Sequence, residues 1–177
     1  KRVALKTLLL LKCSVLLKKA SNKKKALLKD LSDKQIPWNL EGNQLVHGDF
    51  HNQNLLFGLK NEIVGLLDFE EVHKGHGLED VVHFILLGCC NTGFKKENLE
   101  KAQIFLKNYS SHHPFTKKEL KAAIYHWIIR SSTSVFMEEL LLSTRDTFFI
   151  ELIERDRKKV DYLIHEMDSF VEKITDE

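Results

Sequence analysis

Residues 45–80 read LVHGDFHNQNLLFGLKNEIVGLLDFEEVHKGHGLED, and this stretch decides the fold. Its apolar runs are short. The run 45–47 leads into a polar loop, and 55–57 and 63–67 have the composition of two short strands joined by a turn at 58–61. We therefore predict a β-hairpin in this stretch, with a polar loop directly before it.

The residues that follow have the spacing of helices, which we expect at 78–90, 96–109, 117–140 and 146–174. Thr116 followed by Glu119 predicts a capping box at the start of the third helix. Strands and helices do not alternate as they do in a parallel sheet. The prediction is a mainly helical α+β fold, in which a small hairpin-bearing centre is wrapped by helices.

The residues before this stretch also favour helices. Apolar residues recur at helical spacing from Leu5 to Leu16, which predicts an amphipathic helix over 1–19. A second, shorter helix is expected to end at Leu31, and Pro37 closes the helical region because proline disfavours helical geometry in the residue before it.

Composition limits the class of protein. A chain of 177 residues with 43% hydrophobic and 29% charged residues is typical of one globular domain. No uncharged apolar run is long enough for a membrane helix, and the best, 81–90, is interrupted by His83. The 3 cysteines are odd in number and not spaced like a zinc site. We therefore expect a reducing, cytoplasmic setting and no membrane span.

The charges are divided unevenly along the chain. Residues 1–41 hold 11 basic and 3 acidic residues, whereas residues 42–177 hold 16 and 22. A basic end can attract nucleic acid or an acidic membrane. Here no aromatic residues interleave with the lysines to stack on bases. We expect a solvated lysine face on helices and no nucleic-acid partner.

Polar side chains with metal and proton chemistry surround the predicted hairpin. His47, Asp49, His51 and Asn54 lie within one eight-residue loop, and Asp68 ends the next apolar run. A hairpin between them would bring the loop and Asp68 side by side. A carboxylate, an amide oxygen and a second carboxylate are hard ligands, which suit Mg²⁺ and not zinc.

The pattern His47-Gly48-Asp49-x-His51-x-x-Asn54, followed by Leu67-Asp68-Phe69-Glu70, resembles the catalytic core of the aminoglycoside phosphotransferase and choline kinase-like family. These enzymes are small-molecule relatives of protein kinases. The family has an Asp and an Asn five residues apart, then a metal-binding Asp after a short hairpin. The resemblance implies a kinase-like fold and a transferase that uses ATP and magnesium.

The resemblance also implies a role for each matching residue. Asp49 would orient the acceptor hydroxyl and take its proton, whereas Asn54 and Asp68 would hold Mg²⁺ against the nucleotide phosphates. His47 would pack the loop onto the segment around Asp68. Asp80 would brace the loop through backbone N–H groups.

The resemblance covers the C-terminal lobe, roughly residues 40–177. A Gly-rich loop and a strand lysine, which build the family's N-terminal nucleotide lobe, do not precede residue 45. We therefore expect two parts, a basic helical segment at 1–41 packed on a phosphotransferase lobe at 42–177. The nucleotide lobe is expected from the full-length protein, and this chain by itself should bind nucleotide poorly.

The substrate stays open among an aminoglycoside, choline or ethanolamine, homoserine and a sugar. Glu70, Glu71 and Arg130 are possible substrate-binding residues. Two other functions are considered. A non-catalytic pseudokinase-like module would keep the loop without the nucleotide lobe, and a metallohydrolase would use His47, Asp49 and His51 as ligands. The metallohydrolase pattern lacks its usual upstream Asp-x-His and downstream Asn-His pairs.

Overall fold

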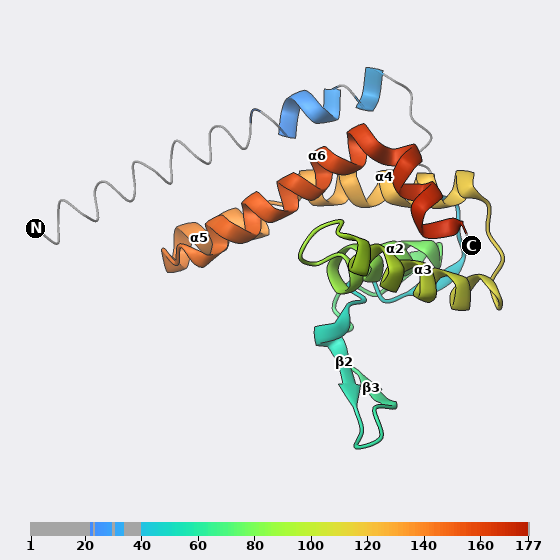
Figure 1. Ribbon diagram of the computed structural model, residues 1–177. Coiled ribbons are helices and arrows are strands. Elements are labelled where there is room, and N and C mark those ends of the chain that lie inside the picture. The colour runs from blue at the N-terminus through green and yellow to red at the C-terminus, as the bar shows by residue number, and fades with distance from the viewer. Residues whose placement is uncertain (1–21, 23, 30, 34–39, 177) are drawn as a thin grey trace, which may run out of the picture. The chain divides into compact units, whose positions relative to one another are not determined.

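A computed structural model describes residues 22, 24–29, 31–33 and 40–176 (Figure 1). Its contacts divide the chain into two compact units. Unit 1 combines the described residues before 36 with Ile128–Asp161, and unit 2 combines those of Pro37–Trp127 and Tyr162–Glu177. The predicted parts 1–41 and 42–177 stay a prediction, and each unit is described by itself.

Unit 2 contains two antiparallel strand pairs. β2 (Leu55–Phe57) and β3 (Ile63–Leu66) form the predicted hairpin, which projects away from the helices α2 and α3 (Figure 1). β1 (Gln44–Val46) pairs with β4 (His73–Gly75), a pairing that the sequence did not predict. The β4 residues His-Lys-Gly lack the apolar alternation of a strand, so their pairing depends on β1 and not on composition.

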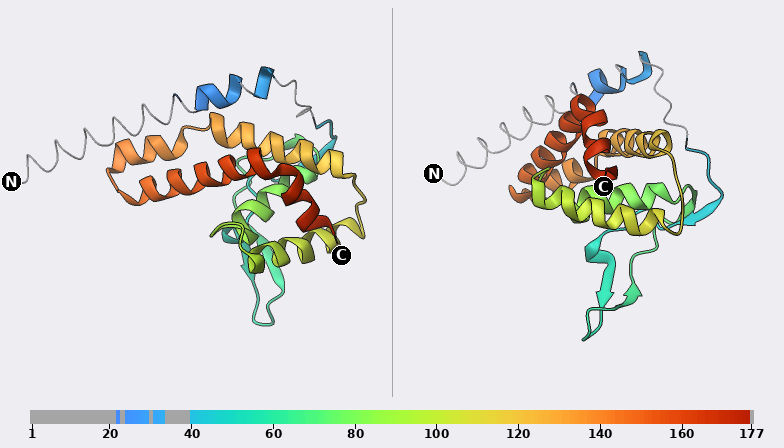
Figure 2. Two further views of the ribbon diagram at one scale, coloured as in Figure 1. Left: turned by 45° about the horizontal axis from the view of Figure 1, so that its top comes forward. Right: turned by 45° about the vertical axis from the view of Figure 1, so that its right-hand side comes forward.

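Helices follow the strands of unit 2, and α2 and α3 lie side by side (Figure 2). α2 (Leu78–Phe84) continues directly into the π-helix η2 (Ile85–Cys89), and α3 (Lys96–Ser110) follows. The N–H of Cys90 donates to the carbonyl of Ile85 at 2.8 Å, the five-residue spacing of a π-helix. The helix predicted at 78–90 is therefore correct in extent, and its last turn is wider than an α-helix.

Buried apolar side chains of these helices form the core of unit 2. Leu78, Ile85 and Leu86 on the first helix and Leu106 on the next are each at most 2% exposed. From the C-terminal part of the chain, Phe170 is fully buried and packs its ring edge on Phe94 at 5.3 Å. Burial of this size is the main favourable term for folding of the unit.

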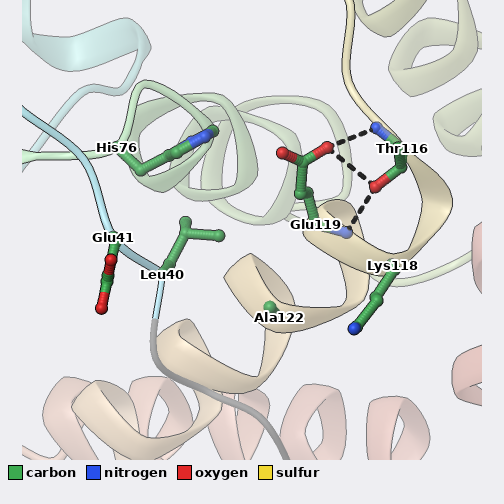
Figure 3. Close-up of a pocket in the computed structure, with 7 residues that line it drawn as sticks. All are labelled: Leu40, Glu41, His76, Thr116, Lys118, Glu119 and Ala122. Carbon is green, nitrogen blue, oxygen red and sulfur yellow. Dashed lines mark hydrogen bonds between the residues drawn. The ribbon is translucent and has the colours of Figure 1, made fainter.

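α4 (Lys117–Thr133) begins with the predicted capping box (Figure 3). The N–H and hydroxyl of Thr116 donate to Glu119 Oε2 at 2.7 Å each, and the Glu119 N–H donates to the Thr116 hydroxyl at 3.2 Å. These hydrogen bonds hold the pKa of the Glu119 carboxyl below its ordinary value. The same residues line a shallow pocket with Leu40, Glu41, His76, Lys118 and Ala122.

The helix predicted at 117–140 is helical at 117–133 and 136–140 but is interrupted at 134–135. α4 ends at Thr133, and a separate helix, α5 (Phe136–Thr144), begins after Val135, which has φ −114° and ψ 7°. The Thr133 hydroxyl donates to the carbonyls of Ile129 and Arg130, at 2.9 and 3.0 Å. Hydroxyl side chains that bond the backbone in this way compete with continued helix.

Unit 1 contains α5 and the first half of α6 (Phe148–Thr175). Leu141 of α5 and Ile153 of α6 are buried together, with Met137, Phe149 and Ile150 packed against them. Near its other end, α6 departs from helical geometry at Glu166. No described helix is both long enough and apolar enough to cross a membrane.

The described residues of the N-terminal segment are helical at 22, 24–29 and 31–33, where the second helix was predicted. Lys24 forms an ion pair with Glu138 at 2.9 Å, both in unit 1. The amphipathic helix predicted at 1–19 and the end predicted at Pro37 lie outside the described residues.

Candidate active site

The polar loop between β1 and β2 carries the candidate site. β1 ends at Val46, which is 1% exposed, and the loop begins at His47, which is also buried. Gly48 has φ +82°, and a Cβ at this position would collide with the backbone carbonyl of Glu71. Only glycine fits there, because it tolerates both the left-handed conformation and the close approach.

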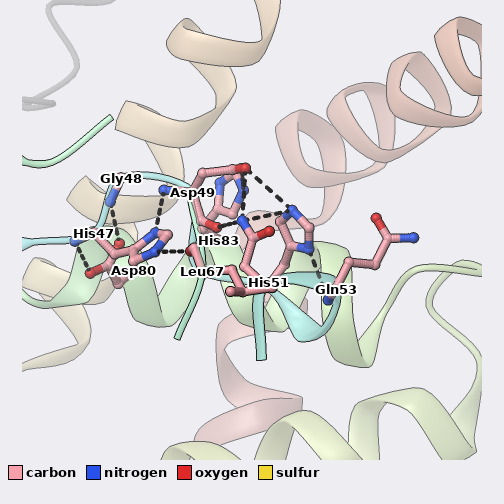
Figure 4. Close-up of polar contacts among 9 residues, drawn as sticks. His47, Gly48, Asp49, His51, Gln53, Leu67, Asp80 and His83 are labelled. Carbon is pink, nitrogen blue, oxygen red and sulfur yellow. Dashed lines mark hydrogen bonds and ion pairs between the residues drawn. The ribbon is translucent and has the colours of Figure 1, made fainter. Parts of the chain in front are cut away.

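The first turn of α2 binds this loop through Asp80 (Figure 4). Asp80 Oδ2 accepts the backbone N–H of His47 at 2.7 Å, and Oδ1 accepts that of Gly48 at 2.9 Å. Hydrogen bonds to a charged acceptor are roughly twice as strong as neutral ones. This is the bracing contact that the family resemblance implies for Asp80.

We expect Asp80→Ala to lower the free energy of unfolding of the 177-residue chain by about 2–4 kcal/mol, since two backbone donors lose a charged acceptor. Urea denaturation measures this change. Glu100→Ala is the control, because Glu100 is an exposed carboxylate whose ion pair with Lys96 spans 3.8 Å. It should cost less than about 0.5 kcal/mol. Equal losses in the two variants would contradict a bracing role for Asp80.

His47 connects the loop to the strand that precedes Asp68. Its Nε2 donates to the carbonyl of Leu67 at 2.8 Å, and its ring lies 5.1 Å from the ring of Phe69. The carbonyl can only accept, so the proton is on Nε2, and Nδ1 accepts the N–H of Asp49 at 3.3 Å. His47 is 6% exposed and therefore serves here as a buried clamp between the loop and the segment around Asp68.

The carboxylate of Asp49 receives hydrogen bonds on both oxygens (Figure 4). His83 Nε2 lies 3.0 Å from Oδ1, while Asn54 Nδ2 and His51 Nε2 lie 3.1 and 3.3 Å from Oδ2. The hydrogen bond from His83 is the largest cause that holds the pKa of the Asp49 carboxyl well below its ordinary value, against a rise from partial burial. Asp49 is therefore ionised at neutral pH.

The orientation of the Asn54 amide follows from its partners. Nδ2 donates to the backbone carbonyl of Asp49 at 2.8 Å and to its carboxylate, and both are acceptors. The amide oxygen is thereby turned away from these two groups. Asn54 is 8% exposed, and its backbone carbonyl accepts the N–H of Leu67 at 2.9 Å.

Asp68 directly follows Leu67, whose backbone binds both Asn54 and His47. It is exposed and has φ +61°, a left-handed conformation that is uncommon outside glycine and concentrates at functional sites. Its carboxylate has no hydrogen bond or ion pair within the described part of the chain. Asn54 and Asp68 thus fit a magnesium site, since one offers a directed amide oxygen and the other an unneutralised carboxylate.

Three further residues were predicted as possible substrate-binding residues. Glu70 and Glu71 are exposed on the turn that follows Asp68. Arg130 is half-buried near the end of α4 and belongs to unit 1, whereas the loop belongs to unit 2. Substrate binding by these three residues stays a prediction.

Sequence reasoning missed His83, which is 9% exposed and touches Asp49. In the sequence it only interrupts an apolar run. A signal was present, however, because Asp80 and His83 are three residues apart in an expected helix and therefore share one face. Once Asp80 is placed under the loop, His83 must lie near the loop as well.

The helices, the loop held by Asp80 and the carboxylate after a short hairpin resemble the fold of kinase-like phosphotransferases. Residues 11–115 match the phosphotransferase enzyme family, and this match spans more than half of the chain, which therefore belongs to that family. The match includes part of the basic segment as well as the site. No curated protein and no solved structure matches the chain.

Proposed function

We propose that the protein is an ATP- and Mg²⁺-dependent kinase that phosphorylates a hydroxyl group of a small molecule. The observation that carries the proposal is the Asp49 carboxylate, which is ionised, held on both oxygens and still 32% exposed in its side chain. A carboxylate held in this way can orient a hydroxyl group. As a weak base, it does not remove the proton before the hydroxyl oxygen attacks. Phosphoryl transfer needs this kind of positioning.

In the proposed step, Asp49 accepts a hydrogen bond from the substrate hydroxyl and takes its proton as the oxygen attacks the γ-phosphorus of ATP. A bond forms between the hydroxyl oxygen and phosphorus. The bond from phosphorus to the β–γ bridging oxygen breaks, and its electron pair leaves with ADP. The depressed pKa of Asp49 suits a late proton transfer, when the attacking oxygen has become much more acidic.

Asn54 and Asp68 are the residues that we propose to hold magnesium. The ion neutralises charge on the nucleotide phosphates when it is bound. The support comes from the donor chemistry: the Asn54 amide is fixed by two acceptors, and Asp68 has a carboxylate without a neutralising partner among residues 40–176. One carboxylate and one amide suffice, since phosphate oxygens and waters complete the shell of magnesium.

We further propose that the hairpin contacts the nucleotide lobe that the family resemblance implies. Several large apolar side chains of the hairpin are exposed, among them Phe57 at 56%, Ile63 at 60% and Val64 at 61%. Contiguous exposed apolar surface usually marks an interaction site.

The metallohydrolase alternative finds no support in the loop. It needs His47 and His51 as ligands, but both ring nitrogens of His47 are engaged, by the Leu67 carbonyl and the Asp49 N–H. His51 Nδ1 accepts the N–H of Gln53 at 3.2 Å, and its Nε2 faces Asp49. No group of three or more metal-binding side chains occurs among the described residues.

The direct test is ADP release by the full-length protein with ATP and Mg²⁺. The acceptors to test are an aminoglycoside, choline, ethanolamine, homoserine and a hexose. We expect one of them to raise ADP release well above the rate without acceptor, and chelation of magnesium to abolish the increase. No stimulation by any of them, together with an absence of ATP binding, would favour the pseudokinase-like alternative.

A further inference from the structure

Residues on one face of α2 contact successive residues of the loop. Asp80, His83 and Phe84 occupy positions i, i+3 and i+4, which share a helix face. Asp80 binds the N–H groups of residues 47 and 48, and His83 binds the carboxylate of Asp49. The ring of Phe84 lies 5.5 Å from that of Phe50. Four successive loop residues are thus held by one helix face.

The partners of His83 fix where its proton lies. Nε2 lies 3.0 Å from Oδ1 of Asp49, a carboxylate oxygen that accepts hydrogen bonds, so Nε2 carries a hydrogen. Nδ1 is buried and has no hydrogen-bond partner in the described part of the chain. A hydrogen on Nδ1 would be a buried donor without an acceptor, which is costly. Nε2 is therefore the nitrogen that donates in this contact.

We infer that His83 is a positioning residue for phosphoryl transfer, which fixes Asp49 by donating Nε2–H to Oδ1. The inference rests on the proposed kinase function. A carboxylate has about four lone-pair positions. Asn54 and His51 approach Oδ2, at 3.1 and 3.3 Å, and His83 takes one position on Oδ1 at 3.0 Å. The position that remains is on Oδ1, the oxygen that His83 holds, so the contact from His83 fixes the direction of the oxygen that meets the substrate hydroxyl.

The side chain of His83 is suited to this role because it is largely buried, which restricts its rotation. It is 11% exposed, and its neighbours Val81, Val82 and Ile85 are buried in the core. Positioning groups whose own rotamers are locked by packing hold a reacting group most precisely. Loss of such an outer contact typically lowers activity by about 10- to 100-fold.

The test compares His83→Leu with His83→Gln in the full-length protein, using the acceptor that stimulates ADP release most. Leucine keeps the burial and removes the donor, whereas the glutamine amide nitrogen reaches the position of imidazole Nε2. We expect His83→Leu to lower kcat by about 10- to 100-fold with the KM for ATP unchanged, and His83→Gln to restore most of kcat. His165→Leu, an exposed histidine of α6, is the control and should leave both constants unchanged.

A second measurement examines the contact without any turnover. Nitrogen-15 NMR of the 177-residue chain should find the hydrogen of His83 on Nε2, and Asp49→Asn should shift this resonance while that of His165 stays in place. Thermal unfolding of both His83 variants shows whether they fold.

The possible outcomes distinguish the positioning role of His83 from the proposed kinase function. An active wild type with unchanged kcat in folded His83→Leu overturns the positioning role alone. Equal losses of kcat in folded His83→Leu and His83→Gln also overturn it, since the ring and not the donor would then matter. An unfolded His83→Leu leaves the decision to His83→Gln and to NMR, where a hydrogen on Nδ1 contradicts the inference. A wild type with no ATP-dependent transfer overturns the proposed function itself.

Discussion

Asp49→Asn is expected to lower kcat of the full-length protein by roughly 10²-fold or more, with nucleotide affinity nearly unchanged. The substitution removes the group that we propose takes the proton of the substrate hydroxyl. It does not remove a metal ligand, because the amide oxygen of Asn54 and the carboxylate of Asp68 are separate groups. Steady-state ADP release gives kcat, and calorimetry with ATP and Mg²⁺ gives the affinity.

The loop must still be folded for this result to be meaningful. An asparagine offers one oxygen where Asp49 offers two to His83, Asn54 and His51, so some stability will be lost. Thermal unfolding of the variant measures that loss. Asp161→Asn makes the same chemical change at an exposed position of α6 and should leave kcat within about twofold. Near wild-type kcat in Asp49→Asn would show that the assignment of the base is wrong.

Asp68→Ala is expected to weaken ATP–Mg²⁺ binding and turnover together. The Asp68 carboxylate is the one negatively charged ligand that we propose for magnesium. Even residues that only contact a ligand change metal affinity by about 10- to 100-fold. We therefore expect a loss of at least about 10-fold in affinity. Calorimetry and steady-state kinetics on the full-length protein measure the two effects.

Asp68→Asn is the sharper form of the same experiment. At φ +61°, alanine strains the backbone, whereas asparagine tolerates the left-handed conformation and removes only the charge. Both variants should weaken binding, and the exposed Asp161→Ala should not. Full ATP–Mg²⁺ affinity in Asp68→Asn would contradict the metal assignment.

The 177-residue chain by itself should bind Mg²⁺, Mn²⁺ and Zn²⁺ only weakly, since one amide and one carboxylate do not replace the water that magnesium sheds reluctantly. Calorimetry with each ion is the measurement. Tight stoichiometric Zn²⁺ binding that disappears on replacement of His47 or His51 would overturn the kinase proposal and favour the metallohydrolase.

Much of the fold was predictable because local signals agreed with the tertiary structure. The hairpin follows from two apolar runs around a turn, and the capping box of α4 follows from Thr116 and Glu119. The break between α4 and α5 was not predicted. Apolar spacing continues through it, and the competing hydrogen bonds of the Thr133 hydroxyl are visible only with the backbone in place.

The strand β4 illustrates a different limit. His73–Gly75 has no strand-like composition and pairs with β1 only because the chain returns past the catalytic loop. Such pairing depends on contacts between residues about thirty positions apart, for which a local pattern carries no signal.

The sequence alone determined the chemical inventory of this protein, that is, the family, the helical lobe, and a loop with Asp49 and Asn54 followed by Asp68. The spacing of these residues along the chain is enough for that. Only the tertiary structure decided how the inventory is arranged, because hydrogen bonds have direction and partners distant in sequence. It showed that His83 contacts Oδ1 of Asp49 and that two acceptors orient the Asn54 amide. It also showed that His47 binds the backbone carbonyl of the residue before Asp68.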